Sequence, residues 1–327
     1  MRIFITGSSG FIGKTAVEHF VKRGWTVLNY DFHRPNIPEH EKYWFDGDVR
    51  ARDQLIGAVM EFKPDYVLNM AAMTGADISG LTPAYFAANT EGVSNLIEGI
   101  RRVGTVKRAA FVSSLLVCRN GYVPKSDTDY CAPNAYGESK VDGELRVRKA
   151  DGTFGEWVII RPSSVWGPWF ELSYKMFFQL IARGLYVNIA GIGDAVKPVT
   201  YVGNAVYMIE KLLLAEPDKV VGQTFYLGDY PQITIRKWAE AIREELKKPR
   251  IPTVPMWLVR LSAKVGDVLV KLGWRNAPMT TFRLTNIQTG GLYPIDKTGA
   301  VVGPLPYTLE DGVRLTVQWM RSQRLVK

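Results

Sequence analysis

The sequence predicts an α/β protein, with a doubly wound parallel sheet and a smaller C-terminal α/β lobe. Short apolar runs alternate with helical stretches through the first half of the chain, and this alternation loosens after Gly167. A glycine triplet also follows the first apolar run. Strands that alternate with helices are typical of parallel sheets with right-handed crossovers. The 327 residues suffice for one large domain, or for two lobes that share a core.

The elements of the first half are predicted from apolar periodicity. Short apolar runs predict strands at 2–6, 26–31, 66–72, 108–115 and 156–165. Helical spacing predicts a helix that ends near residue 23, followed by helices at 51–62, 81–102 and 135–148. Residues 1–167 should therefore form the main domain.

The second half reads as helical patches between loops rich in glycine and proline. The patches are 172–183, 204–214, 235–246, 255–272 and 309–320. The run at 223–229 looks like a strand, so residues 223–247 are expected to return to the main sheet. Residues 168–222 and 248–327 are expected to form the substrate lobe over the carboxyl edge of that sheet.

Composition favours a soluble globular protein of the cytoplasm. Met1 directly precedes a strand-like run, so no signal peptide is expected. Cys118 and Cys131 are the only cysteines, too few for a disulfide framework or a zinc ligand set. Charged residues interrupt the apolar stretch 253–273, so it should be an amphipathic helix packed on a core and not a membrane span. Trp257 beside basic residues leaves a membrane-surface helix as the lesser alternative.

The net charge of +9 does not indicate nucleic acid as a partner. The positive residues are scattered along the chain, and no nucleic-acid-binding module is recognisable. We expect a solvated basic surface and an anionic small molecule as ligand.

The stretch "ITGSSGFIGKT" predicts a phosphate-binding loop. Gly7, Gly10 and Gly13 follow a strand and open a helix, where they permit a tight turn, close approach of a pyrophosphate, and close helix–strand packing. The helix N-terminus adds free N–H groups and a partial positive charge. Asp31 ends the next strand eighteen residues after Gly13, close to the spacing of the acid that binds a ribose hydroxyl. The alternative is a glycine-rich packing turn.

Asp31 favours NAD over NADP, because its carboxylate would repel a 2′-phosphate. His33 and Arg34 follow closely and could soften that preference. Asp48 ends the next strand-like run and has two interpretations of equal weight. It could reach the adenine edge of the cofactor, or it could cap the helix that starts near Arg52.

A Tyr-x-x-x-Lys pair is the candidate catalytic motif. Three such pairs occur, at 136/140, 207/211 and 293/297, so the pattern alone decides nothing. Only Tyr136 follows a strand that ends in "VSS", about twenty residues before it. Tyr136 would be the acid/base, Lys140 would favour its phenolate and hold the nicotinamide ribose, and Ser114 would hydrogen-bond the reacting oxygen.

Other catalytic chemistries have little support in the sequence. The three histidines, His19, His33 and His40, all precede the third predicted strand, so a Ser-His-Asp hydrolase is hard to build. Neither an HExxH nor a CxxC motif occurs, so no metal site is expected.

Together these features resemble the extended short-chain dehydrogenase/reductase family, which includes NAD-dependent nucleotide-sugar epimerases and dehydratases. The resemblance extends over nearly the whole chain. It rests on the glycine triplet, Asp31, Asp48-Val49, "NMAA" at 69–72, Asn89, Ser113-Ser114, Tyr136-x-x-x-Lys140, "RPSSVWGP" at 161–168 and "TYVGNAV" at 200–206.

The resemblance implies a Rossmann domain, roles for individual residues, and a homodimer through helices near 81–102 and 135–150. The implied catalytic residues are Ser114, Tyr136 and Lys140. The implied cofactor-binding residues are Gly7, Gly10, Phe11, Ile12, Gly13, Asp31, Asp48, Val49, Ala71, Ala72, Asn89, Tyr136, Lys140 and Pro162. The implied substrate-binding residues are Ser114, Ser164 and Lys197.

Several positions depart from the family pattern. Leu115 and Leu116 stand where dehydratases carry an Asp-Glu pair, so dehydration is not expected. Ser164 stands where 4-epimerases often have asparagine. Lys197 replaces an arginine common near the substrate phosphates, or it is an ordinary surface lysine. "TYVGN" also resembles the hydroxysteroid dehydrogenase branch.

The leading functional hypothesis is an NAD-dependent nucleotide-sugar 4-epimerase with tightly held cofactor. A 4-ketosugar reductase that uses NAD or NADP is the alternative, together with a hydroxysteroid-type dehydrogenase. A dinucleotide-sensing regulatory protein is the non-enzymatic alternative. The intact Ser114/Tyr136/Lys140 set argues against a sensor, which has no need of it.

Overall fold

The computed structural model describes residues 1–75, 81–170, 173–191, 196–272, 274, 280–281, 284 and 293–327. Its centre is a seven-stranded parallel sheet in the order β11-β6-β5-β4-β1-β2-β3. The strands are β1 (Arg2–Thr6), β2 (Thr26–Asp31), β3 (Trp44–Asp46), β4 (Tyr66–Asn69), β5 (Arg108–Val112), β6 (Glu156–Pro162) and β11 (Gln223–Leu227). This confirms the predicted doubly wound sheet.

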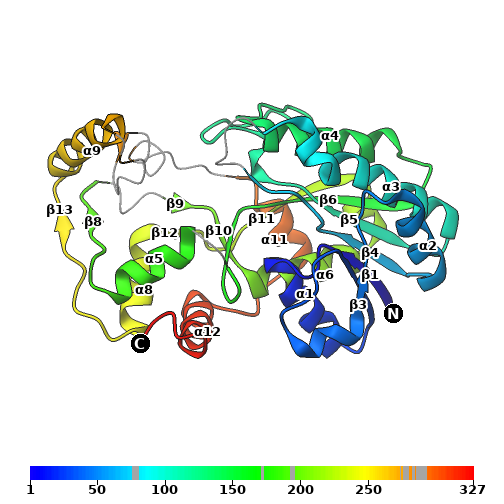
Figure 1. Ribbon diagram of the computed structural model, residues 1–327, viewed down its shortest axis with the longest axis horizontal. Coiled ribbons are helices and arrows are strands. Elements are labelled where there is room, and N and C mark those ends of the chain that lie inside the picture. Colours follow the sequence, from blue (N-terminus) through cyan, green and yellow to red (C-terminus); the bar gives the residue numbers. More distant parts are fainter. Residues whose placement is uncertain are drawn as a thin grey trace.

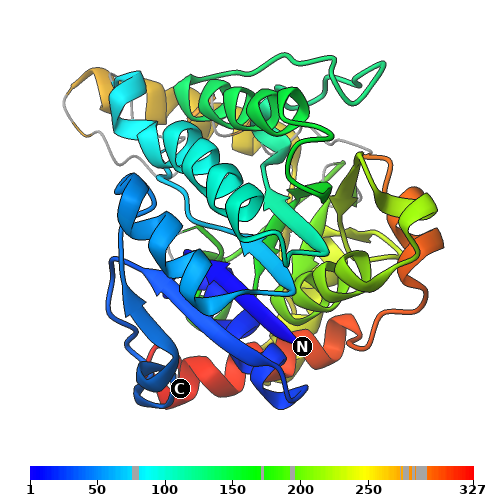
Figure 2. The ribbon, with the colours of Figure 1, turned by 90° about the vertical axis from the view of Figure 1, so that its right-hand side faces the viewer.

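The strands are almost continuously apolar because helices cover both faces of the sheet. One face carries α1 (Phe11–Lys22), α6 (Val202–Leu214) and α11 (Asp296–Val302). The other carries α2 (Arg52–Phe62), α3 (Ala87–Val103) and α4 (Ala135–Lys149). Figure 2 shows α3 and α4 stacked on one side of the sheet, and α6 and α11 on the other. Each layer has its own buried apolar cluster.

The smaller lobe lies beside the carboxyl edge of the sheet (Figure 1). Its helices are α5 (Ser173–Ala182), α8 (Ile235–Glu245), α9 (Met256–Lys271) and α12 (Leu309–Ser322). Its short strand pairs are β7 (Ser164–Trp166) with β10 (Val199–Tyr201), β9 (Val196–Lys197) with β12 (Ile233–Thr234), and β8 (Asn188–Ile189) with β13 (Thr253–Val254). Trp166, Phe178 and Trp238 lie at the centre of its core.

The structure corrects the predicted boundary between the lobes. α6 and the short α7 (Pro217–Val220) fall within 168–222, yet both pack on the main sheet. α8 falls within 223–247, yet its buried face joins the core of the smaller lobe, with α5 and α12. α11, from the last segment, covers β11. Periodicity predicts where a helix forms but not which surface its apolar face covers.

Residues 253–273 were predicted to form an amphipathic helix packed on a core, and only one side of α9 packs in this way. Val259 and Ala263 of α9 are buried against Leu284. The opposite side exposes a row of large apolar side chains, among them Trp257 and Leu272. Within the described part of the chain, no helix is long and apolar enough to cross a membrane.

Candidate active site

The glycine triplet forms a tight link between β1 and α1. Gly7 has a φ of +72°, and a β-carbon there would lie 2.5 Å from the backbone nitrogen of Ala71. A β-carbon at Gly13 would lie 2.4 Å from the Cα of Ser8. Any larger residue at either position would push the loop or α1 away from the sheet.

This link leaves the N-terminus of α1 available to an anion. The N-cap is Gly10, which has no side chain to cap the first N–H groups of the helix. Residues 11–13, which carry the first N–H groups of the helix, line a cavity of about 800 Å³. Cofactor pockets are of this size, roughly 300–1,000 Å³. An uncapped helix N-terminus behind a glycine loop fits the pyrophosphate of a dinucleotide.

Asp31 lies where β2 ends and lines the same cavity. Its carboxylate accepts hydrogen bonds from the backbone N–H groups of Ser9 (2.9 Å) and His33 (2.8 Å). Burial raises the pKa of Asp31, and these two hydrogen bonds oppose the rise. Such a fixed acceptor suits the hydroxyls of a ribose. Arg34, which could have attracted a 2′-phosphate, forms an ion pair with Glu41 at 2.7 Å.

Asp48 does not cap the following helix, so that interpretation is wrong. The N-cap of α2 is Ala51, which makes no side-chain capping hydrogen bond. The Asp48 carboxylate instead binds the Arg50 guanidinium at 2.5 Å and accepts a hydrogen bond from the Arg50 backbone N–H at 2.8 Å. The hydrogen bond with the Arg50 side chain is the main reason that the pKa of Asp48 is lowered. Asp48 and Val49 line the cavity, as the adenine-edge interpretation requires.

Ser114, Tyr136 and Lys140 line the cavity together. Ser114 follows β5 and caps a 3₁₀ turn, where its Oγ accepts the N–H of Leu116 at 3.1 Å. Tyr136 and Lys140 lie one turn apart on α4, whose N-cap is Asn134. The Nζ of Lys140 donates to the carbonyl oxygen of Val112 at 3.1 Å.

The electrostatics of this trio are dominated by burial. Burial raises the pKa of Tyr136, and a side-chain hydrogen bond with Ser114 opposes the rise. Burial lowers the pKa of Lys140 to about 8, against a smaller raising effect of Glu144. The phenol of Tyr136 is therefore protonated at neutral pH. For Tyr136 to act as a base, further positive charge at the site must stabilise its phenolate. The positive nicotinamide ring is such a charge.

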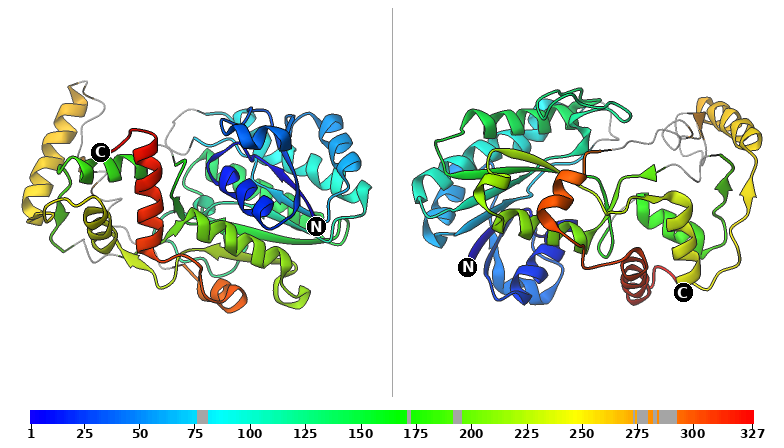
Figure 3. Two further views of the ribbon diagram at one scale, coloured as in Figure 1. Left: turned by 90° about the horizontal axis from the view of Figure 1, so that it is seen from below. Right: turned by 180° about the vertical axis from the view of Figure 1, so that it is seen from behind.

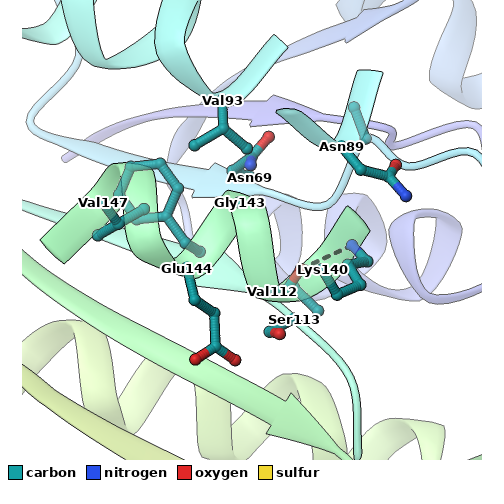
Figure 4. A pocket seen from close by; sticks show the side chains of 11 residues that line it. Asn69, Asn89, Val93, Val112, Ser113, Lys140, Gly143, Glu144 and Val147 are labelled. Carbon is teal, nitrogen blue, oxygen red and sulfur yellow. Dashed lines mark hydrogen bonds between the residues drawn. The ribbon is translucent and has the colours of Figure 1, made fainter. Parts of the chain in front are cut away.

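Asn89 lies behind the cavity and is not part of its lining. Figure 4 shows it beside Lys140, around a small pocket of about 20 Å³. Its side chain accepts the N–H of Met73 (2.8 Å) and donates to the carbonyl of Met73 (3.0 Å) and to the Oγ of Ser139 (2.9 Å). In this structure Asn89 therefore fixes the segment after β4, which does line the cavity.

The other predicted residues fall into two groups. Ala71, Ala72 and Pro162 line the cavity. Ser164 belongs to β7 and interacts with the hydroxyl of Tyr174 on α5. The backbone of Lys197 lies in β9, paired with Ile233, while its side chain lies outside the described residues.

Sequence reasoning missed several residues that line the cavity: Lys14, Phe32, Met70, Met73, Thr74, Tyr85, Val112, Ser113, Ser163 and Val165. Phe32, Met70, Ser113 and Ser163 lie directly after strands of the main sheet, and Met73 and Thr74 follow β4 within five residues. Ligands of open α/β sheets bind outside the carboxyl ends of the strands, so position alone could have found them. Among the residues that the structure describes, no cluster of histidine, cysteine or acidic side chains could hold a metal ion.

The chain is similar to known proteins over most of its length. The model of the NAD dependent epimerase/dehydratase family matches residues 3–228. UDP-glucose 4-epimerase of Vibrio cholerae is 26% identical over 334 residues, covering 97% of this chain and 94% of that protein. The 3 beta-hydroxysteroid dehydrogenase/Delta 5-->4-isomerase of Mycobacterium tuberculosis is 26% identical over 260 residues, covering 74% of this chain and 69% of that protein.

A similar fold occurs in the crystal structure of UDP-glucose 4-epimerase from Thermotoga maritima, solved with UDP-glucose. It superposes with a TM-score of 0.74 at 20% identity, covering 99% of this chain and 100% of that one. At this identity the superposition shows a common fold and no common substrate.

Proposed function

The chain belongs to the NAD dependent epimerase/dehydratase family, and we propose that it is a nucleotide-sugar 4-epimerase that works by transient hydride transfer. Its cofactor is NAD, as the sequence predicted. The observation that carries the proposal is the common cavity, which Ser114, Tyr136 and Lys140 share with Asp31 and the glycine loop. The whole-chain similarity to UDP-glucose 4-epimerases supports this reaction.

Each residue of the trio has a separate task in this reaction. When bound, NAD supplies a reversible hydride acceptor. Tyr136 takes the proton from the substrate hydroxyl and returns it after the ketone has turned over. Ser114 Oγ accepts the Leu116 N–H and also hydrogen-bonds with Tyr136, so its single hydrogen would turn from Tyr136 to the reacting oxygen when substrate binds. Lys140 has three donors and gives one to Val112, which leaves two for the nicotinamide ribose.

The test is turnover of a panel of UDP-, dTDP-, GDP- and CDP-sugars by the purified protein, with epimers detected by NMR. Tyr136→Phe should lower the activity at least a hundredfold, which is the usual scale of general acid–base catalysis. The same variant should still bind NAD. Tyr207→Phe is the matched control, because Tyr207 and Lys211 form the same motif on α6, away from the cavity lining. Consumption of NADH by a 4-ketosugar without epimer formation would favour the reductase alternative.

A second candidate is a hydroxysteroid-type dehydrogenase. Leu115 and Leu116 stand half-buried directly after Ser114, and Ser164 interacts with Tyr174. An apolar pair next to Ser114, and a Ser164 hydroxyl that already has a partner, suit an apolar alcohol better than a charged diphosphate. The Mycobacterium tuberculosis relative supports the same class. Net formation of NADH from an apolar secondary alcohol such as a 3β-hydroxysteroid, with no sugar turnover, would establish this function in place of the first.

We further propose a cytoplasmic homodimer through α3 and α4. The two helices pack side by side on one face of the sheet, and Leu145 stands exposed on the outer side of α4. Light scattering should give twice the mass of one chain, and Leu145→Glu should reduce it to that of one chain. A monomer in the unmodified protein would refute the dimer.

A further inference from the structure

Helix α9 lies at the outer end of the smaller lobe, opposite the end that holds the nucleotide-binding sheet (Figures 1 and 3). Strand β13, directly before it, pairs with β8 and fixes its start. Val259 and Ala263 pack with Leu284 in a small buried cluster, so one side of the helix is held to the protein.

The other side of α9 is an exposed apolar stripe. Its members recur at intervals of three or four residues, which places them on one face of a helix. They are Trp257, Leu261, Val265, Val268 and Leu272, with exposed fractions of 64%, 55%, 51%, 55% and 78%. No residue that the structure describes buries this stripe. Contiguous apolar patches of this kind are rarely exposed to solvent in soluble proteins.

Positive charge borders the stripe. Arg260 and Lys264 are exposed and follow Trp257 by three and seven residues, so they lie along one edge of the apolar face. The single acidic residue of the helix, Asp267, accepts the backbone N–H of Thr281 at 3.0 Å and also binds its hydroxyl. The exposed charges of α9 are therefore positive, on a chain with a net charge of +9.

A membrane-spanning arrangement of α9 and a second copy of this chain both fit the stripe less well. A bilayer core of ~30 Å needs about 20 helical residues, and α9 has 16, so it is too short to span a membrane. A face about 24 Å long and ~10 Å wide offers roughly 240 Å², well below the ~800 Å² per partner of a stable dimer. A second copy of this chain would need much more surface than α9 provides.

We propose that α9 binds the surface of an anionic membrane, with its apolar stripe in the lipid and Arg260 and Lys264 at the headgroups. An apolar face with a tryptophan, next to basic residues, is the arrangement of helices that lie in the membrane interface. Anionic lipids attract such residues electrostatically, and the attraction weakens with salt. This binding does not depend on which substrate the enzyme uses.

The experiment is co-sedimentation of the full chain, loaded with NAD, with lipid vesicles. The protein should sediment with vesicles that contain phosphatidylglycerol, bind vesicles of phosphatidylcholine alone less strongly, and be released by salt. Leu261→Ser combined with Val268→Ser should weaken binding about tenfold or more. Lys264→Gln should weaken it about fivefold on anionic vesicles and hardly at all on neutral ones.

Val123→Ser is the matched control, because Val123 is 75% exposed but belongs to the other lobe. It should bind vesicles as the unmodified protein does, and melting temperatures should confirm that all variants are folded. Brominated lipids should quench tryptophan fluorescence, and Trp257→Phe should remove most of that quenching. The proposal is overturned if the unmodified protein stays in solution, or if the Leu261/Val268 variant binds equally well. It is also overturned if that variant instead dissociates an oligomer that does not bind vesicles.

Discussion

Gly137 lies against the backbone of Leu116, so closely that a β-carbon at position 137 would stand 2.2 Å from the carbonyl oxygen of Leu116. This approach brings the first turn of α4, which carries Tyr136, against the turn that Ser114 caps. The proposed acid/base and the residue proposed to assist it are therefore held together by a residue with no side chain.

Replacement of Gly137 by alanine should separate these two turns. We expect a loss of ~1–3 kcal/mol in the free energy of unfolding, because the backbone carbonyl cannot move aside cheaply. Turnover should fall further than NAD affinity. Urea unfolding and turnover measurements would check this. Gly57→Ala in α2 is the control: a β-carbon there meets nothing within 4 Å, so the variant should gain up to ~1 kcal/mol.

Asp31→Asn should weaken NAD binding by about one to two orders of magnitude, since hydrogen bonds to charged groups contribute ~1.5–3 kcal/mol. The loss of negative charge should also narrow the preference for NAD over NADP. Titration of both dinucleotides by calorimetry would measure these effects. Asp46→Asn provides the comparison, because Asp46 is the register partner of Asp31 on β3 but is exposed and outside the cavity lining. Unchanged NAD affinity in Asp31→Asn would refute the role of this carboxylate.

Lys140 should make the stability of the cofactor-free protein depend on pH. Burial lowers its pKa from 10.5 to about 8 in the folded state, so between these values the unfolded chain binds more protons. Stability should therefore rise as pH increases from about 8 towards 10, by up to ~3 kcal/mol, and the contribution of Lys140 should be constant below pH 8.

The comparison for this pH effect is Lys140→Met, followed by urea unfolding at each pH. The difference in the free energy of unfolding between the two proteins should change over that interval and be flat below it. A difference that is independent of pH throughout would contradict the lowered pKa of Lys140.

Glu144 should be essential for stability. It forms a buried ion pair with Arg161 at 2.7 Å, and both side chains are almost fully inaccessible. Glu144→Ala leaves the Arg161 guanidinium buried without its carboxylate, so a loss of ~3–5 kcal/mol is expected in chemical denaturation. Asp142→Ala removes an exposed pair with Arg146 on the same helix and should cost less than about 1 kcal/mol. Equal losses in the two variants would contradict this assignment.

The glycine loop, the strands and the tyrosine–lysine helix could be predicted because their signals are local. Gly7, Gly10 and Gly13 have fixed spacing, and the strands of the sheet are almost continuously apolar. Both signals arise from constraints on the backbone or on burial within a few residues, and neither needs knowledge of a distant partner.

Other features depend on partners far away in sequence. Asn89 resembled a cofactor ligand, but its amide is occupied by Met73 and Ser139, and spacing cannot reveal such contacts. The sequence position of Asp48 is compatible with a helix cap, but its carboxylate forms an ion pair with Arg50. The exposed side of α9 was predicted only as the lesser alternative, because an apolar stripe has the same pattern whether protein covers it or not.

The chain passes between the two lobes several times, since α6, β11 and α11 belong to the sheet while α5, α8 and α12 belong to its neighbour. Substrate preference therefore cannot be transplanted from a relative as one continuous block. A chimaera would have to exchange the separate inserts together, and a single cut anywhere in the second half before α11 ends would take a strand or helix from the nucleotide-binding core.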